Sequence, residues 1–245
     1  MNTCIETTLD QDKKFSVFGT IFWMLFLAFG IQGLVGIVAG IVLTFSGVEV
    51  KNIELAFLRP DLLAGTLIIS AIISIPFLKK AANHSAKSFP FQFLAIKAID
   101  KTIMVKVLLL GLAYYILESA LAFWLAIDTP AFMLDVKSQV NGGLDLLLLI
   151  ISVCIIAPIF EELIFRGLAF ARIERSKLGI VGAIFITSII FTLIHVQYEP
   201  MVLGFLFIFA LLLGFIRYKT QNIVYCIALH ALINSLSTFD LFVFL

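Results

Sequence analysis

Residues 158–166 read PIFEELIFR, which places the carboxylates of Glu161 and Glu162 and the guanidinium of Arg166 inside a predominantly apolar run from Leu144 to Phe170. A charge at the middle of a bilayer costs about 2.5 to 3.5 kcal/mol on insertion scales. Three charges so close together therefore need an arrangement that compensates them. Ionisable residues inside membrane segments commonly mark functional sites, so we expect the site of this chain to form around this stretch.

Helical spacing divides the three charges into a pair and a single acid. Glu162 and Arg166 are four residues apart, so they lie on one helix face with the acid first, which is the favoured order. Glu161 is turned by about 100° from Glu162, at roughly 3.6 residues per turn, so it has no partner within the helix. We expect Glu162 and Arg166 to neutralise each other as supporting residues and Glu161 to be a candidate general base.

The composition indicates a membrane protein. The chain has 245 residues, of which 62% are hydrophobic and 13% are charged, and its mean hydropathy is +1.12. These values lie far outside the range of soluble globular domains. The net charge of +1 and the lack of a basic run interleaved with aromatic residues argue against a nucleic-acid partner. We therefore predict an all-α, polytopic helical bundle in a lipid bilayer.

About 20 apolar residues are needed for one membrane-spanning helix, and the sequence offers about seven such segments. They lie near residues 16–45, 62–78, 105–127, 144–170, 179–197, 201–216 and 222–239. We expect residues 1–140 to form variable amino-terminal helices with a cytoplasmic interfacial segment at 79–106. Residues 141–245 are expected to form a four-helix core around the charged stretch.

Loop charges predict the orientation of the bundle. Lysines and arginines gather in residues 79–106, 171–177 and 217–219, whereas the alternate connections carry mixed or acidic charge. Because cytoplasmic loops carry the excess of positive charge, all three basic segments are expected in the cytoplasm. The amino terminus is then cytoplasmic and the carboxyl terminus lies outside.

Two of the three histidines fall in apolar segments with a companion at helical spacing. His195 follows Phe191 by four residues, and His230 precedes Asn234 by four. A lone histidine in an apolar helix is usually a hydrogen-bonded packing residue, but two of them and an acidic pair on three separate helices favour a shared polar site. Glu118 is a further isolated acid, in the third segment, and is interpreted as a packing or access residue.

Three motifs follow one another along the chain, Glu161-Glu162-x-x-x-Arg166, Phe191-x-x-x-His195 and His230-x-x-x-Asn234. In this order, about 30 residues apart, they resemble the CPBP family of intramembrane proteases. That family includes the type II CAAX prenyl endopeptidases and bacterial proteins related to bacteriocin processing and immunity. The resemblance covers roughly Asp145 to Leu236, and it implies a multi-pass protein of a bacterial inner membrane.

The resemblance also implies roles for individual residues. Glu161 and His195 would activate a water molecule that attacks a peptide carbonyl, and His230 and Asn234 would hold the oxyanion of the tetrahedral intermediate. The substrate would be a membrane-associated peptide or protein. No cofactor is favoured; the alternative is a catalytic zinc bound by Glu161, His195 and His230, although the helical His-Glu-x-x-His zinc motif is absent from the sequence.

Two functions of other classes stay open at this point. Chains of intramembrane Glu and His residues also serve proton-coupled transporters, and a non-catalytic protein could keep the fold to bind a peptide in an immunity role.

A shared site also demands a particular geometry. For the three catalytic side chains to meet, part of residues 171–182 must lie along the membrane interface, where Gly179 and Gly182 would allow a break, or the segment 179–197 must be strongly tilted. Hydrolysis would also need a path for water, which Ser188, Thr192 and Ser235 could line.

Overall fold

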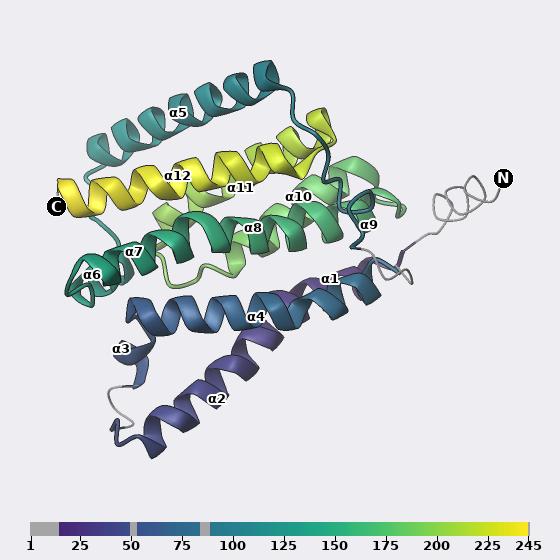
Figure 1. The fold of residues 1–245 in the computed structure, drawn as a ribbon. Helices are drawn as coiled ribbons and strands as arrows, with labels where there is room; N and C mark the ends of the chain where they lie inside the picture. Colours follow the sequence, from purple (N-terminus) through teal and green to yellow (C-terminus); the bar gives the residue numbers. More distant parts are fainter. Residues whose placement is uncertain (1–14, 50–52, 84–88, 245) are drawn as a thin grey trace.

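The protein is an all-helical bundle in its computed structural model (Figure 1). The structure describes residues 15–49, 53–83 and 89–244, and within these ranges it contains helices and turns but no strand. This confirms the predicted all-α fold. The predicted cytoplasmic amino terminus, in residues 1–14, lies outside the described residues.

The amino-terminal half contains α1 (Val17–Leu25), the π-helix η1 (Phe26–Gly30), α2 (Ile31–Phe45), α3 (Ile53–Phe57), α4 (Pro60–Ala81), α5 (Lys101–Trp124) and α6 (Ala131–Ser138). The remainder contains α7 (Gly143–Ile150), η3 (Ile151–Ile156), α8 (Ala157–Glu162), η4 (Leu163–Ala169), α9 (Phe170–Glu174), α10 (Gly179–Leu193), α11 (Pro200–Thr220) and α12 (Ile223–Val243). The segments from α1 to α2 and from α7 to α9 each form one long helix with π-helical turns.

Six helices of the described chain are long and apolar enough to cross a membrane. They correspond to six of the seven predicted segments. The remaining predicted segment, 179–197, corresponds to α10, which has 15 residues. Polar caps explain several of the helix starts: the Asp100 side chain accepts from the backbone amides of Thr102 and Ile103, and the Asn222 side chain accepts from that of Val224.

The helix that carries His195 is shorter than predicted. We expected it to extend over 179–197, but α10 ends at Leu193, so His195 lies in the turn that follows. A helix of 15 residues is about 22 Å long at 1.5 Å per residue, which is less than the roughly 30 Å of a hydrocarbon core. The predicted break occurs as well, because the chain leaves α9 at Glu174 and begins α10 at Gly179 with a φ of +57°.

The helix from α7 to α9 runs through the middle of the bundle (Figure 1). It packs against α12 on one side and against α1 and α4 on the other, while α5 covers the outer face of α12. Phe165, Leu168 and Ala169 on η4 are fully buried in the main core cluster. The stretch that carries the two glutamates is therefore the most enclosed part of the molecule.

The three basic segments meet at one end of the bundle, which we call the basic end. Residues 89–100, here called the cap segment, close it: the amide of Ile223 donates to the carbonyl of Ala95 at 3.0 Å, and the ring of Phe93 lies under the guanidinium of Arg175. Phe91 is exposed as an interfacial residue should be, but Leu94 is fully buried in the main core. The cap segment therefore seals this end rather than only lying on a membrane surface. Residues 84–88 of the predicted interfacial segment lie outside the described residues.

The predicted orientation can be checked by cysteine labelling from outside intact cells. In a Cys4→Ser background the two remaining cysteines are buried. Gly142→Cys, between α6 and α7, adds a side chain that meets open space, and Ile99→Cys replaces a half-exposed residue of the cap segment. We expect a membrane-impermeant maleimide to label Gly142→Cys in intact cells and Ile99→Cys only after permeabilisation, because basic loops stay in the cytoplasm. The reverse pattern would show the opposite orientation.

Candidate active site

Glu162 is the centre of a buried polar cluster. Its Oε1 atom accepts a hydrogen bond from Nη1 of Arg166 at 3.0 Å and lies 3.0 Å from Nδ1 of His230. Glu162 and Arg166 are both fully buried. Arg166 also donates through Nη2 to the carbonyl of Ala210 on α11, at 3.0 Å, and its guanidinium lies over the ring of Phe191. The predicted pair is present, and it connects α8, α10, α11 and α12.

Glu161 has no such partner. The Oε2 atom of its carboxylate is buried without a hydrogen bond, and it lies 3.9 Å from Nε2 of His230. The side chain as a whole keeps 21% of its surface exposed, because it faces a cavity rather than packed side chains. Adjacent positions on one helix thus hold one neutralised acid and one available acid, as the spacing predicted.

His195 and His230 each use Nδ1 to bond the protein. Nδ1 of His195 lies 2.7 Å from the carbonyl oxygen of Phe191. A carbonyl oxygen can only accept, so Nδ1 carries the proton, and in the neutral ring Nε2 presents a lone pair. This bond also satisfies one of the last carbonyls of α10. Nδ1 of His230 likewise donates to the Glu162 carboxylate, which leaves Nε2 toward Glu161.

Asn234 is held by a feature of the long central helix. Its Nδ2 donates to the carbonyl of Val153 at 2.8 Å. That carbonyl is available because η3 is π-helical: the amide of Ala157 bonds back to Ser152, and the next residue, Pro158, has no N–H to offer. The amide of Asn234 retains a second N–H, which is a free donor in the described structure.

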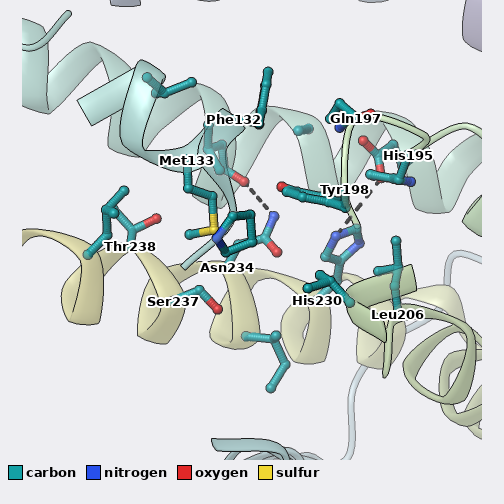
Figure 2. Close-up of a pocket in the computed structure, with 18 of the residues that line it drawn as sticks. Phe132, Met133, His195, Gln197, Tyr198, Leu206, His230, Asn234, Ser237 and Thr238 are labelled. Carbon is teal, nitrogen blue, oxygen red and sulfur yellow. Dashed lines mark hydrogen bonds and ion pairs between the residues drawn. The ribbon is translucent and has the colours of Figure 1, made fainter. Parts of the chain in front are cut away.

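One cavity of about 680 Å³ joins the four predicted catalytic residues. Glu161, His195, His230 and Asn234 all line it. Figure 2 shows His195 and His230 toward one end of the drawn region, with Asn234 and Thr238 farther along α12. A second cavity, of about 180 Å³, lies on the other side of Glu161 and His195 against η1. Irregular backbone at membrane depth is tolerated where it lines a cavity, and the turn after α10 lies between these two cavities.

Tyr198 is a site residue that the sequence reasoning missed. Its ring is parallel to that of His195, with the centroids 6.2 Å apart, and it lines the large cavity with Gln197. Burial raises the pKa of Tyr198 to about 12, and the negative charges of Glu161 and Glu199 add to this. The phenol is therefore a neutral O–H donor at physiological pH. Its position three residues after His195 was the only feature of the sequence that could have indicated a place in the site.

The prediction of which residues line the water path was wrong. None of Ser188, Thr192 and Ser235 lines the cavity, and Thr192 and Ser235 donate to carbonyls of their own helices. Serine and threonine side chains often do so in apolar helices. The polar lining of the cavity instead includes Ser152, Ser237 and Thr238. Glu118 also lines the cavity, which agrees with an access residue rather than a packing one.

The residues proposed as zinc ligands have suitable donor atoms, but their side chains are not close enough together to form a metal site in the described structure. Both histidines donate Nδ1–H to an oxygen acceptor, as metal-ligating histidines commonly do, and Glu161 offers an oxygen without a hydrogen bond. Within the described parts of the chain, however, no three His, Cys, Asp or Glu side chains are close enough to form a metal site.

Comparison with known proteins identifies the carboxyl-terminal part of the chain. Residues 143–236 match the family model for Type II CAAX prenyl endopeptidase Rce1-like. The matched region begins at the first residue of α7 and ends two residues after Asn234, so it contains the whole cluster described above. This confirms the predicted resemblance to the CPBP family. No curated protein and no solved structure matches the chain.

The buried pair should be essential for stability. Arg166→Met leaves the Glu162 carboxylate buried with His230 alone, so we expect it to lower the free energy of unfolding by about 3 to 5 kcal/mol. A matched control is Arg59→Met, which removes an ion pair to Asp61 with about half of each side chain exposed and should cost about 1 kcal/mol or less. Reversible unfolding by SDS in mixed micelles measures both. Equal losses would contradict a structural role for the buried pair.

Proposed function

We propose that this chain, in which residues 143–236 form a type II CAAX prenyl endopeptidase Rce1-like domain, is an intramembrane endopeptidase that hydrolyses a peptide bond in a membrane-associated substrate. One observation carries the proposal. Glu162 is neutralised by Arg166 and His230, whereas Glu161, one residue earlier, faces the same cavity as both histidines with an unbonded oxygen. A buried structural acid beside an available acid is the arrangement that a general base requires.

In the proposed reaction Glu161 accepts a proton from water, and the water oxygen forms a bond to the peptide carbonyl carbon. Nε2 of His195 orients that water by accepting its second hydrogen, because its Nδ1 proton is held by the Phe191 carbonyl. The proton on Glu161 then passes to the leaving nitrogen as the carbon–nitrogen bond breaks. Such proton transfers contribute about 10² to 10⁴ in rate.

The oxyanion of the intermediate needs hydrogen-bond donors. Asn234 supplies the N–H that is not used by Val153. His230 would donate through Nε2, with its Nδ1 held by the Glu162 carboxylate. Each donor preorganised in a cavity with little water is typically worth about 10² to 10³ in rate. Both residues come from α12, so one rigid helix would hold both donors.

A zinc-dependent reaction is the alternative within the same site. Glu161, His195 and His230 would hold the ion, which would act as a Lewis acid on water when bound. The side-chain chemistry allows it, and the reaction without metal is the one that we propose.

We expect Glu161→Gln to abolish cleavage of a membrane peptide by the reconstituted protein, with a loss of at least about 10³-fold, because the amide cannot accept the proton. Circular dichroism and gel filtration should show a folded protein. Glu199→Gln is the matched control, since Glu199 is exposed beside Tyr198 and does not line the cavity. Cleavage retained by Glu161→Gln would remove this residue from the mechanism.

The same variant separates the other two functions. Peptide protection in cells that survives Glu161→Gln would favour a non-catalytic immunity role. Proton flux through wild-type protein in liposomes, without cleavage, would favour a transporter.

A chelator distinguishes the two hydrolytic mechanisms. We expect the purified protein to keep its peptidase activity after treatment with EDTA and dialysis, because water activation is assigned to Glu161 and His195. A loss of activity that added Zn²⁺ restores, and that Mg²⁺ does not, would assign the reaction to zinc.

A further inference from the structure

The large cavity extends from the catalytic residues away from the basic end. Its far part is lined by the connection between α5 and α6, by α6 itself and by the last turns of α12; the lining residues there include Asp128, Thr129, Phe132, Thr238 and Leu241. The amino-terminal part of α4 contributes Leu63 and Thr66. Among the described residues, none from the cap segment lines the cavity. The cavity therefore extends from Glu161 toward the end opposite to the basic loops.

Apart from the two histidines, the charged residues of this cavity are all acidic. Glu118, Asp128 and Glu161 line it, and no lysine or arginine of the described chain does. Lys137 on α6 contacts a residue of the cavity wall: its ammonium donates a hydrogen bond to the carbonyl of Leu241 at 2.9 Å. Lys137 is held at that carbonyl and over the ring of Phe242, so it caps the end of α12 and does not face the cavity.

The remainder of the wall combines apolar side chains with unused hydrogen-bonding groups. Leu67, Phe205 and Leu206 represent the apolar part. Ser70 on α4 is fully buried and lines the cavity with a hydroxyl that has no hydrogen-bond partner. Because an unsatisfied buried hydroxyl is unfavourable, this position can hydrogen-bond a polar group of a ligand. The Oε2 atom of Glu161 is a second such group.

We propose that the cavity binds an apolar peptide segment that carries a lysine or arginine side chain, and that it cleaves this segment at an internal peptide bond. The carboxylates of Glu118 and Asp128 would attract the cationic side chain. A free α-carboxylate would meet Glu118 and Asp128 as like charges, with no lysine or arginine on the described cavity wall. This inference rests on the proposed peptidase function, and it narrows the substrate class to cationic apolar segments that enter from the end opposite to the basic loops.

The test uses four forms of one apolar, fluorophore-labelled peptide. Three of them end in an amide and carry lysine, glutamine or glutamate at the same position. The fourth carries lysine and ends in a free carboxylate three residues after the scissile bond. Binding is measured by fluorescence anisotropy on the Glu161→Gln protein, so it does not depend on cleavage. We expect the lysine amide to bind about tenfold more tightly than the glutamine form and about a hundredfold more tightly than the glutamate form. The free carboxylate should weaken binding about tenfold.

Adding Glu118→Gln should reduce the preference for lysine over glutamine about threefold, because Asp128 remains. Asp135→Asn is the matched control, because Asp135 is an exposed acid of α6 that does not line the cavity, and it should leave the preference unchanged. Equal binding of all four peptides, or tighter binding of the glutamate or free-carboxylate form, would overturn the inference. If the protein with the added Glu118→Gln change does not fold, the four peptides measured on the Glu161→Gln protein still test the inference.

The two proposals fail in different ways. Wild-type protein that binds the lysine peptide selectively but cleaves none of the four would refute the peptidase function and support the cationic site. Wild-type protein that cleaves all four with equal kcat/KM would support the peptidase function and refute the cationic site.

Discussion

The structure depends on the neutralisation of one fully buried carboxylate. Glu162 is held between the guanidinium of Arg166 and Nδ1 of His230, each at 3.0 Å, and Arg166 reaches the carbonyl of Ala210 from the same place. Removing one partner of such a pair leaves an uncompensated charge, which is far more costly than losing an exposed ion pair. Three helices are therefore fixed around one oxygen atom. Because Glu161 is the preceding residue, turned by about 100°, the same constraint directs it into the cavity.

Departures from regular α-helix position the remaining site residues. The π-helical η3, followed by Pro158, leaves the carbonyl of Val153 available for Asn234. The π-helical η4 carries Arg166, whose own carbonyl accepts from Nε of Arg217 at 3.0 Å. The early end of α10 lets His195 cap that helix and turn toward Glu161. Functional sites are where π-helical turns are frequently found, and here η3 and η4 each provide a backbone carbonyl that holds a side chain.

The sequence predicted what local spacing and hydropathy can specify. The six long apolar helices, the pair of Glu162 and Arg166, and the separation of Glu161 from that pair all follow from apolar length and helical period. The bond from Glu162 to His230 could not be predicted, because it joins residues 68 positions apart. Tyr198 was missed for a related reason: it lies in a turn that was expected at the membrane surface, and only the shortness of α10 brings it into the bundle.

The two ends of the bundle differ in a way that connects topology with substrate choice. At the basic end, Leu94 of the cap segment is buried in the core. The guanidinium of Arg172 donates hydrogen bonds to the Thr20 hydroxyl and to the carbonyl of Ala81, so this positive charge stabilises the packing of the helices. At the opposite end the cavity is lined by carboxylates and apolar side chains. Lysine and arginine orient a membrane protein by staying in the cytoplasm. On the described cavity wall, the charged residues other than histidine are Glu118, Asp128 and Glu161. The two ends of the bundle thus separate the charges that hold the fold together from those that face the cavity.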